Sequence, residues 1–139
     1  MAVTVALGVF LANPAPAHAT DTKFQVTHAH SGGAGTIAVS IKGNIDWLNR
    51  SVRLYNMQIF VKGGECGIGW LAGYQTNSQG DEVLIDRNRT DTYCPYGDAW
   101  YPVPDITLDG SFISGGITRL KVQAWDETHQ GGTWGTFNR

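Results

Sequence analysis

The signatures that identify common enzyme classes are missing from this sequence of 139 residues. No P-loop, zincin or serine-hydrolase motif is present, and no G-x-G-x-x-G stands at a strand-to-helix turn. The chain has only three glutamates, and its aspartates lie mostly in turn-like segments, so spacing alone selects no acid and base pair. The sequence therefore favours a protein that is not catalytic. A small enzyme whose site is assembled from distant residues stays open as an alternative.

Charge is also sparse and nearly balanced, with 10 Lys and Arg against 12 Asp and Glu and a formal net charge of −2. The basic residues are scattered, and their one local concentration, DRNR at 86–89, includes Asp86. A nucleic-acid-binding domain is expected to carry a basic patch or stripe, and a protein that binds anionic lipid a polybasic segment. We therefore expect neither nucleic acid nor a membrane surface as a partner.

Long apolar runs are absent except for AVTVALGVFLA at residues 2–12. This run is shorter than the roughly 20 residues that cross a bilayer, but it has the length of a signal-peptide core and precedes the A-x-A pattern at 17–19. The pattern predicts a signal peptide at 1–19, cleavage after Ala19 and a secreted, extracellular domain of residues 20–139, with no membrane insertion after cleavage. The basic residues that usually precede a signal-peptide core are missing, since the apolar run begins directly after Met1. A buried helix is the alternative interpretation of this run.

Cysteine is rare as well, since the chain contains only Cys66 and Cys94. In an exported protein an isolated pair most simply forms one disulfide. A thiolate metal site would need further cysteines, or histidines at ligand spacing, and neither is found near these two residues. The pair therefore predicts a bridge that ties GGECGIGW at 63–70 to YCPYGDAW at 93–100.

Short alternating runs of apolar and polar residues, separated by glycine-rich turns, are what the chain does contain. Residues 24–42 predict a β-hairpin around SGGAG, and a phase slip near Leu54 predicts a β-bulge. Residues 117–127 fit either a helix or a strand, and their β-branched residues and flanking glycines favour the strand. Seven or eight such strands predict an all-β antiparallel sandwich or barrel with one disulfide.

The sequence HAH is the sharpest chemical feature, because His28 and His30 stand at positions i and i+2 of a predicted strand. Residues so spaced point to the same face, and two imidazoles on one face can share a zinc or copper ion. His129, or an Asp or Glu residue, would supply a third ligand. The alternative is that both histidines are exposed near the end of the chain and bind no metal.

Aromatic residues are plentiful, and two groups are expected. Trp70 and Trp125 lie in strand patterns and should fill the space between sheets. The others stand beside turn residues, glycines or prolines, where rigid exposed rings form sugar platforms or protein hot spots. These are Trp47, Tyr96, Trp100, Tyr101 and Trp134.

YCPYGDAWYP at residues 93–102 concentrates several of these rings and is expected to be a loop pinned by Cys94. A loop that is already ordered in the free protein favours binding of a partner, because its order need not be created on binding. Tyr93 and Trp100 could equally fill the core. We therefore predict a secreted recognition domain that binds a polysaccharide or a protein partner through aromatic rings near the disulfide. A metal-binding protein that uses the HAH pair is the alternative, and in that case a divalent metal is the only cofactor.

Overall fold

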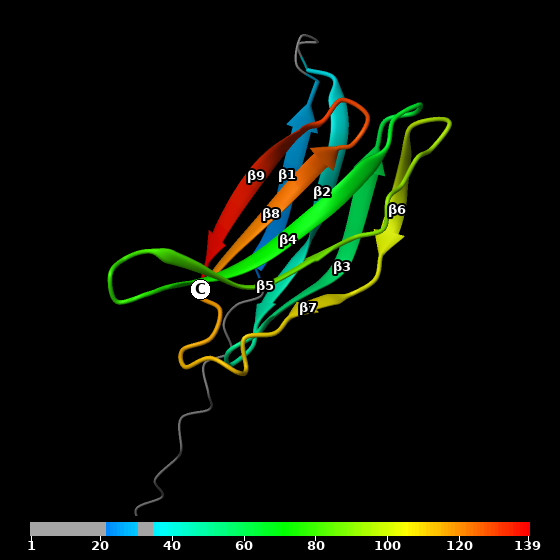
Figure 1. The fold of residues 1–139 in the computed structure, drawn as a ribbon. Helices are drawn as coiled ribbons and strands as arrows, with labels where there is room; N and C mark the ends of the chain where they lie inside the picture. The colour runs from blue at the N-terminus through cyan, green and yellow to red at the C-terminus, as the bar shows by residue number, and fades with distance from the viewer. Residues whose placement is uncertain (1–21, 31–34) are drawn as a thin grey trace, which may run out of the picture.

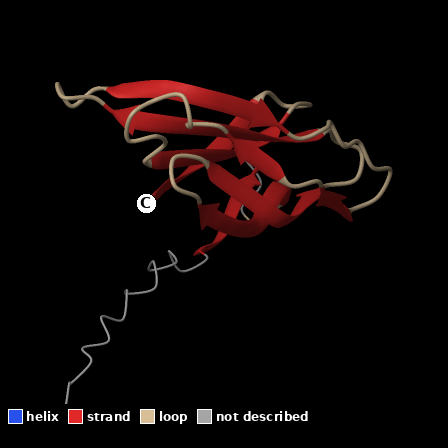
Figure 2. Ribbon diagram, turned by 90° about the horizontal axis from the view of Figure 1, so that it is seen from below, coloured by secondary structure: helices blue, strands red, loops and turns tan. Residues whose placement is uncertain are grey.

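Two antiparallel β-sheets packed face to face form the architecture, as the two views in Figures 1 and 2 show. The computed structural model describes residues 22–30 and 35–139, which contain nine β-strands and no helix. Within these ranges, therefore, nothing helical is long and apolar enough to cross a membrane. The predicted all-β sandwich is confirmed, whereas the predicted signal peptide lies outside the described residues.

The five-stranded sheet has the order β1-β2-β3-β6, and β7 pairs with β3 beyond the end of β6. Its strands are β1 (Thr22–Ala29), β2 (Ile37–Trp47), β3 (Val52–Val61), β6 (Ala99–Val103) and β7 (Ile106–Leu108). The four-stranded sheet has the order β5-β4-β8-β9. Its strands are β4 (Gly67–Thr76), β5 (Glu82–Arg89), β8 (Arg119–Asp126) and β9 (Gly131–Asn138).

The predicted hairpin and bulge are both confirmed. β1 and β2 pair as an antiparallel hairpin, and the pairing of β2 with β3 is irregular opposite Gly43, where β3 carries the extra residue Asn56. Asn56 has a φ of 48°, and this insertion lets both Leu54 and Met57 point into the core. Residues 119–126 form strand β8, so the helical alternative for this segment is wrong.

Strand β4 turns its glycines, rather than its aromatic residues, toward the opposite sheet. A Cβ atom on Gly69 would lie 2.6 Å from Ile41 Cδ1, and one on Gly73 would lie 2.6 Å from a core isoleucine. Packing is so close at both positions that only glycine fits, and the alternate residues Trp70 and Tyr74 point to the other face of the sheet. The prediction that Trp70 and Trp125 fill the space between the sheets is therefore wrong, because both rings lie on the outer face of the four-stranded sheet.

Glu82 on β5 links two cations on that outer face. Its carboxylate accepts a hydrogen bond from Lys121 at 2.8 Å and another from Arg119. These hydrogen bonds lower the pKa of the Glu82 carboxyl below its ordinary value of 4.5. A lowered pKa in the folded state means that the stabilisation is present above the ordinary value and is lost as the pH falls through the lowered one.

We therefore expect Glu82→Gln to lower the Tm at neutral pH and to have no effect well below pH 4.5. The measurement is the difference in Tm between wild type and variant as a function of pH. Asp81→Asn is the matched control, because the Asp81 carboxylate forms no ion pair among the described residues. A difference that stays constant down to strongly acidic pH would contradict the expectation.

Candidate metal centre

Four side chains that are distant in the sequence meet at one end of the sandwich, the upper end in Figure 1. They are His30 after β1, Glu65 between β3 and β4, and Asp126 and His129 where β8 turns into β9. Each offers an imidazole nitrogen or a carboxylate oxygen, and these atoms all lie within 4.8 Å of one another. Such a set of nitrogen and oxygen donors is a ligand set that zinc accepts.

Asp126, the last residue of β8, is completely buried and is held by its own turn. Its Oδ1 accepts hydrogen bonds from the backbone N–H groups of Thr128 at 3.0 Å and His129 at 3.2 Å. Its Oδ2 lies 2.9 Å from His129 Nδ1. One carboxylate oxygen therefore caps the turn, and the other points to the centre of the group.

Glu65 is the second buried carboxylate, with 8% of the residue exposed. Its Oε1 lies 2.5 Å from His30 Nε2 and 3.9 Å from His129 Nδ1. Its Oε2 is buried and has no hydrogen-bond partner among the described residues. A buried polar atom without a partner is uncommon and calls for an explanation, and an ion at the site is one.

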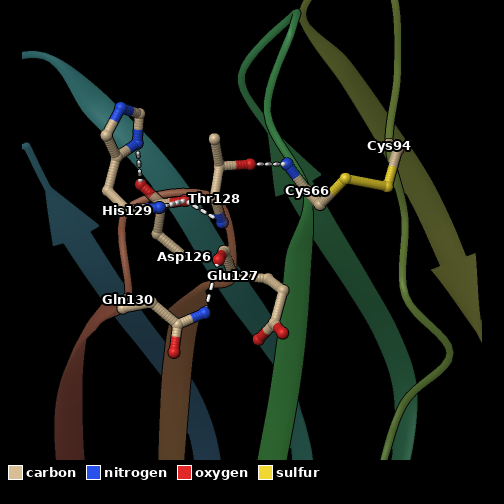
Figure 3. The surroundings of a disulfide bond; sticks show 7 residues. All are labelled: Cys66, Cys94, Asp126, Glu127, Thr128, His129 and Gln130. Atoms are coloured by element: carbon tan, nitrogen blue, oxygen red, sulfur yellow. Dashed lines mark hydrogen bonds and ion pairs between the residues drawn. A yellow bond between two sulfur atoms is a disulfide. The ribbon is translucent and has the colours of Figure 1, made fainter.

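A disulfide lies beside the turn after Asp126, and one of its cysteines, Cys66, forms a hydrogen bond with that turn, as Figure 3 shows. Cys66 is bonded to Cys94, which confirms the predicted bridge. The backbone N–H of Cys66 donates to Thr128 Oγ1 at 2.8 Å, and its carbonyl accepts from the N–H of Glu127 at 2.9 Å. The turn after Asp126 is thereby joined to the residue that follows Glu65.

The two histidines of HAH take different partners. The register of β1 against β2 shifts between His28 and Ala29, and His30 lies between the two carboxylates, with its Nδ1 3.9 Å from Asp126 Oδ2. The His28 Nδ1 instead shares a hydrogen bond of 3.0 Å with Thr133 Oγ1. Both rings line a hollow of about 440 Å³, but His30 alone of the pair belongs to the four-residue group.

His129 completes the group, and it is the residue that the sequence suggested as a third ligand. Its ring packs edge-on against that of His30, with ring centroids 4.8 Å apart. With 55% of its side chain exposed, His129 is also the most accessible of the four. The site is therefore open to solvent on the His129 side and closed on the side of the acids.

The charge of the group suits a bound cation. Glu65 and Asp126 are two buried carboxyl groups whose ligand oxygens lie within 4.8 Å of each other, and burying unbalanced charge is costly. A divalent cation between them would balance the charge of both carboxylates.

The spacing of the donor atoms suits a small cation. Zinc bonds of about 2.0–2.1 Å in a tetrahedron place ligand atoms roughly 3.3 Å apart. Three donor distances in the group are 2.5, 2.9 and 3.9 Å, on both sides of that value. Small rotations of the side chains would therefore convert the hydrogen-bonded arrangement into a coordination sphere.

The segment at 93–102 is only partly a loop, because Ala99–Val103 forms strand β6 and pairs with β3. Adjacent rings on this strand point to opposite faces. Tyr101 packs inward and stacks on Tyr93 at 4.8 Å between ring centroids. Trp100 is 44% exposed on the outer face, with Lys42 Nζ 4.3 Å from the centroid of its ring.

The remaining predicted rings lie elsewhere. Tyr96 is fully exposed in the loop after Cys94, whereas Trp47 at the end of β2 is half-buried beneath Arg139. Trp134 lies on β9, in the other sheet. The five predicted rings therefore do not assemble into one platform near the disulfide.

Glu65 and Asp126 were not identified as ligands from the sequence. The position of Asp126 is typical of a turn residue, and its Oδ1 does cap the turn. The only local signal for its second role is His129 three residues later. Glu65 carries no signal beyond its position before Cys66. Searches of protein-family models, curated proteins and solved structures returned no match for this chain.

Proposed function

We propose that this is a secreted metal-binding protein that holds a divalent ion of the zinc class with His30, Glu65, Asp126 and His129. The observation that carries the proposal is the buried pair of acids, one with an unpartnered oxygen, facing two imidazoles at 2.5–2.9 Å. Secretion is supported by the predicted signal peptide and by the disulfide, since disulfides persist in oxidising compartments.

The ligand set also suggests what the ion does. Four protein ligands fill a tetrahedral sphere, as in structural zinc sites, whereas catalytic sites keep one position for water or substrate. The ion would join the end of β1, the β3–β4 connection and the β8–β9 turn. No disulfide among the described residues joins these three segments to one another. Metal binding should therefore stabilise the fold, and the proposed role is binding rather than catalysis.

Zinc is expected to raise the Tm of the oxidised protein. At a hundredfold excess over its dissociation constant, a ligand of the folded state adds about 2.7 kcal/mol, or about 10 °C for a domain of this size. We expect His129→Ala to abolish this rise, because it removes an imidazole from the group. The measurements are thermal unfolding and calorimetric titration with zinc chloride after treatment with a chelator.

His28→Ala is the matched control, since His28 lines the same hollow but bonds to Thr133. The proposal requires this variant to bind zinc as wild type does. Equal loss in His28→Ala and His129→Ala would instead indicate the HAH pair as the site. No saturable zinc binding by wild type would overturn the proposal.

Recognition of a glycan or protein partner through the rings near the disulfide stays a prediction. The observation that favours it is the exposed indole of Trp100, which packs against Phe60 at 5.5 Å and beneath Lys42. We expect Trp100→Ala to fold normally and to lose a partner that uses this surface. Unchanged binding of every partner isolated with wild type would contradict that role.

A further inference from the structure

The outer face of the four-stranded sheet carries aromatic and cationic side chains in register. Trp70 on β4 is paired with Arg89 on one side and with Gln123 on the other. Gln123 is in turn paired with Trp134 on the edge strand β9. The Arg89 guanidinium lies over the Trp70 ring, 5.5 Å from its centroid. A row of side chains with an indole near each end therefore crosses the sheet.

A hollow opens beside this row, where β4 carries the small residue Ala72. Trp70 precedes Ala72 by two positions and Tyr74 follows it by two, so both rings stand on the same face as the alanine. Arg87 on β5 and Trp134 on β9 complete the walls of the hollow. The volume is about 240 Å³, below the roughly 300–1,000 Å³ of pockets for drug-sized ligands, which suits one ring of a larger chain.

The charge of this face is opposite to that of the whole protein. Arg87, Arg89, Arg119 and Lys121 all stand at outward positions, and Glu82 forms ion pairs with Arg119 and Lys121. Neither Arg87 nor Arg89 forms an ion pair among the described residues. The protein has a net charge of −2, so the aromatic hollow carries a local positive excess.

We propose that this hollow binds one sugar ring of an acidic polysaccharide built from uronic acids. Aromatic side chains present flat apolar faces on which a pyranose ring can stack, and their polar edges remain free for hydrogen bonds. The carboxylate of a uronic acid is attached to the ring itself, so a ring seated over Ala72 brings its charge to the rim. Arg87 at that rim offers the planar fork that matches a carboxylate.

Single-stranded nucleic acid also combines stacked rings with cations, but it requires a positively charged groove that follows the backbone over several nucleotides. This face has one small hollow and two unpaired arginines on a single strand. The arrangement fits one charged ring better than a continuous phosphate chain, and we therefore commit to the polysaccharide.

The test is affinity electrophoresis of the folded protein through gels that contain polygalacturonate. We expect retardation that weakens with salt, and at least a tenfold loss of affinity in Trp134→Ala and in Arg87→Gln. The controls are Phe112→Ala and Lys23→Gln, which change an exposed ring in the β7–β8 connection and a cation on the five-stranded sheet. Both should bind as wild type does, and all four variants should keep the Tm and the zinc response of wild type.

Three results would overturn the inference: no retardation of wild type by polygalacturonate, equal retardation of wild type and Trp134→Ala, or tighter binding of a single-stranded oligonucleotide or of dextran sulfate, which contains no uronic acid. Loss of binding in Trp100→Ala instead of Trp134→Ala would move the site to the five-stranded sheet. Because the zinc group lies at the end of the sandwich and not on this face, failure of either proposal leaves the other standing.

Discussion

Replacing both Cys66 and Cys94 with serine is expected to lower the free energy of unfolding by about 3–4 kcal/mol, the chain-entropy value for a loop of this length. The bridge joins residues separated by 28 positions, and each cysteine lies in a connection that crosses from one sheet to the other. Without it, the two crossings would be held by backbone pairing between Gly67 and Tyr93 and by a few turn hydrogen bonds.

The same replacement should weaken zinc binding, because Cys66 positions both acids of the metal centre. Glu65 precedes it directly, and its N–H and carbonyl hold the turn after Asp126. We therefore expect the zinc-dependent rise in Tm to be smaller in the double variant than in oxidised wild type. Denaturant unfolding with and without zinc measures both effects.

Reductant provides the control for the disulfide prediction. The chain contains two cysteines only, so a reducing agent should destabilise wild type to the level of the double variant and leave the variant itself unchanged. A double variant within 1 kcal/mol of oxidised wild type would show that backbone pairing alone holds the two crossings.

Local patterns predicted the strands well but not which side of β4 faces the opposite sheet. In β4, the positions of Ile68, Trp70 and Tyr74 form the more apolar face, and a single strand read by itself would bury them. The structure turns the other face toward the opposite sheet, because Ile41 of that sheet packs directly onto Gly69. That outcome depends on the distance between the sheets, which no alternation pattern within one strand contains.

Strand β9 shows a related effect of the fold. Its sequence, GGTWGTFN, interleaves three glycines, which weaken strand preference, with the strand-favouring Thr133, Trp134, Thr136 and Phe137. The neighbouring strands supply what it lacks, since Trp125 covers Gly132 and Val26 of the opposite sheet packs on Gly135. Tertiary contacts therefore override local propensity in this segment.

The proposed metal centre is only partly predictable from the sequence, because its four residues come together through the fold. HAH drew attention to His30, but the register shift after His28 separates the two rings. Glu65 reaches the site because the backbone of the next residue, Cys66, forms hydrogen bonds with the β8–β9 turn. The cations illustrate the same point, since basic residues that are scattered in the sequence gather on one face of a sheet.

Gly116→Ala is expected to lower the free energy of unfolding by about 3–5 kcal/mol, combining strain at positive φ with a backbone clash. Gly116 has a φ of 63°, and an added Cβ would lie 2.3 Å from the carbonyl oxygen and 2.4 Å from the Cα of Arg50. Those atoms cannot rotate away as the end of a flexible side chain would. The segment also cannot retreat easily, because the next residue, Ile117, is fully buried and donates its N–H to the Arg50 carbonyl at 2.7 Å.

Gly80→Ala separates the two contributions to this effect. Gly80 has a φ of 87°, but an added Cβ there would meet nothing within 4 Å. Its replacement should therefore cost only the strain of the left-handed conformation, about 1–2 kcal/mol, as measured by denaturant unfolding. If Gly116→Ala loses no more stability than Gly80→Ala, the backbone of Arg50 must be able to shift and relieve the clash. The connection from β7 to β8 would then be held by the burial of Ile117 and not by the close approach of two backbones.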